Sequence, residues 1–121
     1  GGTRHLGDTA EMQPMNQGVD SAFYIKRSNN QTKKLWRGKE LIADPFDNRR
    51  LTEQFTEEAI KFIQASRSRP FFLYLPFTAP HFPAQAHPDW KDKSANEAYG
   101  DVVEELDSRI GEILNMLKGE N

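Results

Sequence analysis

The chain has 121 residues, of which 36% are hydrophobic and 28% are charged, and it contains no cysteine. This composition is typical of one soluble globular domain with a modest core, and it excludes a disulfide framework, a thiolate metal site and a cysteine nucleophile. The formal net charge of −2 favours neither nucleic acid nor a membrane as a partner, and no apolar run approaches the roughly 20 residues that a membrane-spanning helix needs.

The first third of the chain predicts a loop followed by a small hairpin. Residues 1–20 show no periodicity and are expected to form an extended loop. The aromatic run at residues 23–25 is interpreted as a strand or the edge of one. Between residues 33 and 43, two apolar pairs flank Gly38, which can supply the positive φ angle that hairpin turns often need.

A helix is predicted from Leu51 to Ser66. Apolar side chains recur there at steps of three and four residues, which places them on one face. Thr52 is the expected N-cap, and glutamates early in the segment suit the positive end of the helix dipole. Pro70 prevents the helix from continuing.

Residues 71–75, Phe-Phe-Leu-Tyr-Leu, are apolar on both faces and bounded by prolines. This pattern predicts a strand of a parallel sheet that is buried on both sides. A helix followed closely by such a strand is half of a βαβ unit, so the predicted class is α/β. The following loop, residues 76–88, holds four of the seven prolines together with His81 and His87. This loop follows the carboxyl end of the predicted strand, and ligands of open α/β sheets bind at the carboxyl ends of the strands.

A second helix is predicted from Ser94 to Lys118. Ser94 and Glu97 fit a capping box, and Gly119 is a natural stop. A continuous apolar stripe runs along this segment. Four acidic residues raise the alternative of metal ligation, but we interpret them as the solvated face of the helix: Asp101, Glu104, Glu105 and Asp107.

Several motifs, in order along nearly the whole chain, resemble those of the sulfatase family. Residues 70–83, Pro-Phe-Phe-Leu-Tyr-Leu-Pro-Phe-Thr-Ala-Pro-His-Phe-Pro, resemble its strand and histidine loop, and the segments 51–63 and 99–117 resemble the helices on either side. Residues 2–7, Gly-Thr-Arg-His-Leu-Gly, resemble a motif in which Gly-Lys-Trp-His-Leu-Gly is usual. Residues 16–20, Asn-Gln-Gly-Val-Asp, fit the Gly-Phe-Asp step that follows.

The resemblance implies a partial alkaline-phosphatase-like sandwich of class α/β, with a buried parallel strand flanked by two amphipathic helices and a small hairpin. Residues 1–121 are then one incomplete segment of a sulfatase catalytic domain, whose other segments are its partners. Family members hydrolyse sulfate esters with calcium and with a formylglycine, made from the cysteine or serine of a Cys-x-Pro-x-Arg motif, whose hydrated aldehyde attacks sulfur. Their locations are periplasmic, secreted or lysosomal.

The resemblance assigns roles to three residues of this chain. His81 matches the histidine that contacts the sulfate and is a candidate general acid. His5 matches the histidine that hydrogen-bonds the formylglycine. The sulfate-binding lysine of the family falls at Thr3, which has no charge, and the adjacent Arg4 is a shifted candidate for binding the sulfate. The calcium ligands and the nucleophile motif lie outside this sequence, so we expect the chain alone to hydrolyse no aryl sulfate.

Three features allow a binding as well as a structural interpretation. A stretch free of acidic residues is interpreted as the solvated face of the hairpin, with a rim that attracts a sulfated glycan as the alternative: Lys26, Arg27, Lys33, Lys34, Arg37 and Lys39. Trp36 and Trp90 are expected to pack or to stack on sugar rings. His87 lies outside the matched motif and is expected at the surface.

Two functions from other classes stay open beside the sulfatase hypothesis. One is a non-catalytic module on a sulfatase scaffold that binds anionic glycans, which the uncharged Thr3 favours. The other is a relative that hydrolyses phosphate or phosphonate esters, since the superfamily shares much of its scaffold.

Overall fold

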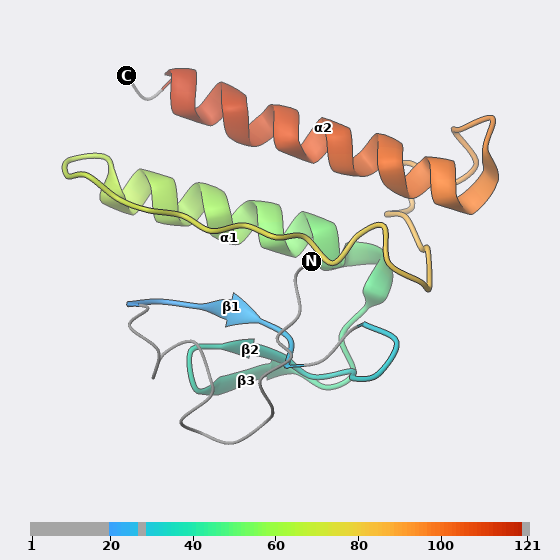
Figure 1. Ribbon diagram of the computed structural model, residues 1–121, viewed down its shortest axis with the longest axis horizontal. Helices are drawn as coiled ribbons and strands as arrows, with labels where there is room; N and C mark the ends of the chain where they lie inside the picture. The colour runs from blue at the N-terminus through green and yellow to red at the C-terminus, as the bar shows by residue number, and fades with distance from the viewer. Residues whose placement is uncertain (1–19, 27–28, 120–121) are drawn as a thin grey trace.

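The computed structural model describes residues 20–26 and 29–119, and these form an α/β arrangement (Figure 1). In chain order the elements are the strands β1 (Phe23–Tyr24), β2 (Leu35–Arg37) and β3 (Glu40–Ala43), the 3-10 helix η3 (Asn48–Arg50), and the helices α1 (Leu51–Ser66) and α2 (Glu97–Gly119).

The elements stack in three layers, with α1 between the small sheet and α2 (Figure 1). One cluster of buried side chains joins the sheet region to the first half of α1, and its members are Ile25, Leu35, Phe46, Leu51 and Phe55. A second cluster joins α1 to α2 through Ala59, Ile63 and Ile113. Because α1 contributes to both clusters, a side chain fixed to the start of α1 is fixed to the whole fold.

The sheet is an antiparallel meander in the order β1-β2-β3. The predicted hairpin between residues 33 and 43 is confirmed, and its turn contains Gly38 with φ +59°. A side chain rarely adopts this angle, which explains the glycine. The backbone N–H of Gly38 also donates to the carbonyl of Ala22 at 2.7 Å, and this bond ties the turn to the chain just before β1.

Helix α1 has the predicted bounds, but its predicted cap is wrong. Thr52 is buried inside the first turn of α1 and does not cap it. The short helix η3 runs directly into α1, so the capping position lies upstream at Asp47, whose carboxylate accepts a hydrogen bond from the backbone N–H of Arg49 at 3.0 Å.

Residues 71–75 do not form the predicted strand with two buried faces. The segment returns beside α1 (Figure 1), and its Leu73 and Leu75 are half-buried against the two core clusters. Phe72 and Tyr74 point the other way and are 86% and 73% exposed. Strand assignment requires hydrogen bonds to a neighbouring strand, and none of the described residues provides one here. The alternating burial is that of a strand with one covered face.

Helix α2 begins three residues later than predicted. Ser94 accepts a hydrogen bond from the backbone N–H of Asn96 at 2.9 Å, and the helix starts at Glu97, whose φ is +55°. The predicted capping box is therefore not formed. Among the helices of the described ranges, none combines the length and the apolar character needed to cross a membrane.

Candidate functional site

Residues 76–96 form the loop between the segment 71–75 and α2, and this loop lies beside the starts of both helices (Figure 1). A turn opens this loop, in which the backbone N–H of His81 donates to the carbonyl of Thr78 at 3.0 Å. Thr78 is buried and His81 is exposed. The loop thus places an imidazole at the surface three residues after a buried side chain.

The imidazole of His81 has a defined orientation. Its Nδ1 lies 2.6 Å from the carbonyl oxygen of Phe82. A carbonyl oxygen only accepts hydrogen bonds, so Nδ1 carries the proton in this contact. Nε2 has no hydrogen-bond partner among the described residues, and it is therefore the atom that can exchange a proton with a ligand.

The residues around His81 are held by two asparagines that lie far away in the sequence. Nδ2 of Asn48 donates to the carbonyl of Pro83 at 3.0 Å and to Oε1 of Gln85 at 2.9 Å. Nδ2 of Asn29 donates to Oδ1 of Asn48 at 3.0 Å and lies 3.4 Å from the carbonyl of His81. Sequence reasoning missed both asparagines, because no local pattern shows which loop a turn residue will contact.

The far end of the same loop is anchored by His87, which is buried rather than at the surface as predicted. Its Nε2 lies 3.1 Å from Oε2 of Glu53 in the first turn of α1 and 3.0 Å from Nη1 of Arg50, the last residue of η3. Its backbone N–H donates to Oε1 of Glu105 on α2 at 3.0 Å. The residue therefore joins the loop to both helices.

Two of the four acidic residues on α2 are buried, which corrects the prediction that all four are solvated. Asp101 is 3% exposed and accepts hydrogen bonds from the backbone N–H groups of Asp92 and Ser94, each at 2.8 Å. Glu105 is 1% exposed and pairs with Arg109 at 3.3 Å. The loop before α2 supplies both N–H groups that bind Asp101, whereas Arg109, the partner of Glu105, lies on α2 itself. The other two acidic residues are exposed, as predicted: Glu104 and Asp107.

Arg109 completes this buried charged cluster. It lies 3.5 Å from Oε2 of Glu53 and places its guanidinium 4.7 Å from the ring centre of Trp90. The Trp90 ring also meets His87 edge-on, with ring centres 6.1 Å apart. Trp90 thus has the packing role that was one of its two interpretations.

The sequence profile of the sulfatase family matches residues 3–121. The chain belongs to the sulfatase family. It is 32% identical to an N-acetylgalactosamine-6-sulfatase of Mus musculus over 97% of this chain and 26% of that protein. It is 39% identical to a steryl-sulfatase of Homo sapiens over 69% of this chain and 14% of that protein. The chain therefore spans about a quarter or less of the length of these relatives.

Solved structures confirm the expected fold class. The crystal structure of Ps i-CgsB matches 98% of this chain and 33% of its own, with a TM-score of 0.81 at 22% identity. The structure of the same protein in complex with k-i-k-neocarrahexaose matches with a TM-score of 0.75 at 23% identity, over 98% of this chain and 33% of its own. At these identities the likeness concerns the fold.

Of the three site residues that the sulfatase resemblance assigns, only His81 is described by the structure. His5 and Arg4 lie outside the described residues, as does Thr3. The structure therefore leaves the two N-terminal assignments as predictions.

Calcium ions in proteins are bound by oxygen ligands, above all carboxylates. No group of three such side chains within residues 20–26 and 29–119 could hold a metal ion. The two most buried carboxylates, Asp101 and Glu105, are engaged by backbone N–H groups and by Arg109. The described part of this sulfatase segment therefore does not fit a calcium site.

Several cations of the predicted basic stretch have partners within the chain. The guanidinium of Arg37 forms an ion pair with Glu58 on α1, and this hydrogen bond raises the pKa of Arg37 above its ordinary value. The ammonium of Lys26 lies 4.1 Å from the ring centre of Trp36. Arg27 lies outside the described residues. These contacts favour the structural interpretation of this stretch.

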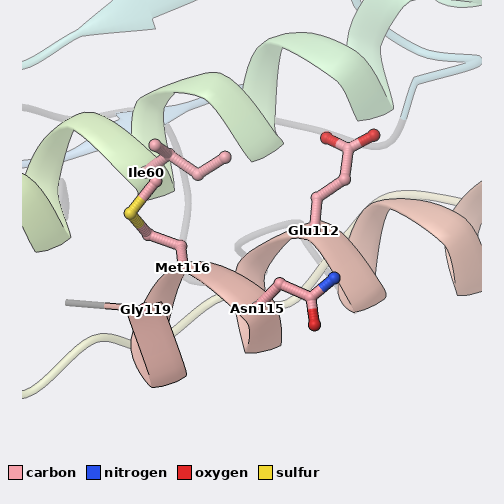
Figure 2. Close-up of a pocket in the computed structure, with 5 residues that line it drawn as sticks. All are labelled: Ile60, Glu112, Asn115, Met116 and Gly119. Atoms are coloured by element: carbon pink, nitrogen blue, oxygen red, sulfur yellow. The ribbon is translucent and has the colours of Figure 1, made fainter. Parts of the chain in front are cut away.

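A shallow depression between α1 and α2 is unrelated to the histidine loop (Figure 2). Its wall consists of Ile60, Glu112, Asn115, Met116 and Gly119. Figure 2 shows the Met116 side chain pointing toward Ile60. The one ionisable side chain among these five, Glu112, pairs with Arg109 at 3.3 Å.

Proposed function

We propose that this chain is one incomplete segment of the catalytic domain of a sulfatase, and that the complete enzyme hydrolyses sulfate esters. The observation that carries the proposal is the exposed imidazole of His81, oriented by the carbonyl of Phe82, on a loop that is anchored at both ends. Membership of the sulfatase family supports the reaction class.

His81 acts as the general acid in this proposal. As the bond between sulfur and the leaving oxygen breaks, its electron pair moves to that oxygen, and the proton on Nε2 transfers to it and leaves a neutral imidazole. A new bond forms between sulfur and the oxygen of the nucleophile. A formylglycine would supply that oxygen, as the family resemblance implies. A general acid placed in this way typically accelerates a reaction by about 10²–10⁴-fold.

A sulfated sugar is the substrate class that we propose. The relative named as an N-acetylgalactosamine-6-sulfatase supports it, and so does the neighbour whose structure contains k-i-k-neocarrahexaose. A calcium ion and a location in the periplasm, the lysosome or the exterior of the cell belong to the same proposal, and both rest on the family resemblance alone.

The test is a His81→Ala variant of the complete enzyme, measured on 4-nitrophenyl sulfate, on phenyl sulfate and on N-acetylgalactosamine 6-sulfate. We expect kcat on phenyl sulfate and on N-acetylgalactosamine 6-sulfate to fall about 100-fold or more, because their leaving oxygens are more basic than that of 4-nitrophenol and need the proton. The 121-residue chain is expected to release no sulfate from any of the three. Turnover by the purified chain, or unchanged turnover by the variant, contradicts the proposal.

A further inference from the structure

The carbonyl that orients the His81 imidazole lies between two others that the asparagines hold. The carbonyl of residue 81 faces Asn29 at 3.4 Å, that of Phe82 bonds the imidazole at 2.6 Å, and that of Pro83 accepts from Asn48 at 3.0 Å. Three consecutive peptide groups are therefore tied to side chains. The direction of Nε2 depends on the middle carbonyl, so it depends on the two that flank it.

Asn48 is attached to a rigid part of the molecule. It is the first residue of η3, which runs directly into α1, and α1 contributes to both core clusters. Both N–H groups of its carboxamide are used by the loop, and its oxygen is used by Asn29. The hydrogen bonds of Asn48 thus fix the histidine loop to η3 and, through η3, to the start of α1.

Asn29 orients the carboxamide of Asn48 through the hydrogen bond to its oxygen. It is 3% exposed, and its Oδ1 has no hydrogen-bond partner among the described residues. A cavity of about 10 Å³ is lined by Asn29, Asn48, Thr78 and His81 together with other residues. This volume is about the space that one water molecule needs, and a buried water would satisfy that oxygen. Asn29 and Asn48 therefore form a small polar cluster next to the backbone of His81.

We propose that Asn48, supported by Asn29, is a positioning residue that aims Nε2 of His81 at the leaving oxygen of the substrate. This inference rests on the proposed sulfatase function. In this arrangement neither asparagine contacts the substrate. A displacement of about 1 Å of a catalytic group can reduce a rate about 100-fold, so the loss of the Asn48 contacts is expected to reduce proton transfer by a large factor.

The experiment compares Asn48→Asp with the wild type in the complete enzyme, on phenyl sulfate and on 4-nitrophenyl sulfate. Aspartate keeps the size of the side chain and the acceptor for Asn29, but it turns an oxygen toward the carbonyl of Pro83. We expect kcat on phenyl sulfate to fall at least about 10-fold, with KM nearly unchanged. The fall on 4-nitrophenyl sulfate is expected to be much smaller, because its phenolate leaves with little help from an acid.

The ratio of the two substrates separates positioning from mere destabilisation. A loss of folded enzyme lowers both rates by the same factor, and an equal fall on both substrates overturns the inference, as does no fall at all. Should Asn48→Asp not fold, Asn48→Ala removes the same donor without adding a charge, and the same ratio decides. Arg49→Gln is the matched control, because Arg49 is exposed on the same turn and its hydrogen bonds go to Asp47 rather than to the histidine loop.

His81→Ala is measured beside these variants and must itself discriminate between the two substrates. If it does not, the assignment of the general acid in the proposed function fails. If it does and Asn48→Asp does not, the proposed function stands and the inference about Asn48 is wrong.

Discussion

Glu105 is a carboxylate with 1% exposure, held by the backbone N–H of His87 at 3.0 Å and by the guanidinium of Arg109 at 3.3 Å. Burial of a carboxylate is costly, and only partners of this kind offset the cost. Arg109 in turn lies near Glu53 on α1 at 3.5 Å. Glu105 therefore links the loop, α2 and α1 through charge rather than through apolar contact.

Replacement of Glu105 by alanine is expected to lower the free energy of unfolding by about 3 kcal/mol, since it leaves the buried Arg109 without the most buried of its three carboxylate partners. Urea denaturation of the 121-residue chain measures this loss. The neighbouring Glu104 is exposed on the same helix, so Glu104→Ala serves as the control, and its effect should stay within about 0.5 kcal/mol. Equal effects of the two substitutions would show that the buried pair does not stabilise the fold.

The burial of Glu105 could not be predicted from the sequence of α2 alone. An acidic residue beside an apolar helical stripe usually faces water, and Glu104 and Asp107 do so. The spacing of Asp101, Glu105 and Arg109 at steps of four residues is the signal that places them on one face. What the spacing does not show is that a loop rich in proline supplies backbone N–H groups to that face.

Asp47 defines the start of η3 and hence the element that carries Asn48. Its carboxylate accepts from the backbone N–H of Arg49 at 3.0 Å and from the Arg49 side chain at 3.0 and 3.1 Å. Asp47→Ala is expected to lower the free energy of unfolding by about 1 kcal/mol through loss of the cap. Asp47→Asn keeps a capping acceptor and should lose less. Chemical denaturation at neutral pH compares the two variants with the wild type.

The contribution of the Asp47 charge is expected to depend on pH. The hydrogen bond from the Arg49 side chain is the main cause that holds the pKa of Asp47 below its ordinary value. A carboxyl group with a lower pKa in the folded state stabilises that state fully above its unfolded pKa of about 3.9. This stabilisation is lost as the pH falls through the folded pKa. The difference between wild type and Asp47→Asn should therefore disappear in acid, and a difference that persists there contradicts this account.

At the scale of whole elements, sequence reasoning succeeded where the signal is local. The bounds of α1 follow from the periodicity of its apolar face, and the hairpin follows from Gly38. It failed for residues 71–75, because the burial of a strand depends on neighbouring strands that can lie anywhere in a chain. For the proposed site, the family motif predicts His81, which stays a prediction, whereas Asn29 and Asn48 contact the histidine loop across 52 and 35 residues, which no local pattern indicates.

The described chain as a whole leaves one side of the segment 71–75 uncovered. Leu73 and Leu75 pack toward the helices, whereas Phe72 and Tyr74 are exposed on the opposite side. No described residue forms backbone hydrogen bonds along this segment. An apolar segment with unpaired N–H and C=O groups is a template for pairing with another chain. The 121-residue protein is therefore expected to associate with itself through these residues.

Sedimentation velocity over a range of concentrations tests this expectation. The wild-type chain should form dimers or larger species as its concentration rises, and replacement of both Phe72 and Tyr74 by serine should shift it toward the monomer, because the apolar surface that drives the pairing is removed. Leu41→Ser is the control, since Leu41 is also exposed but lies on β3 of the small sheet rather than on the segment 71–75. A wild-type chain that stays monomeric throughout, or a double variant that associates as strongly as the wild type, would mean that the segment 71–75 is not the surface at which two chains meet.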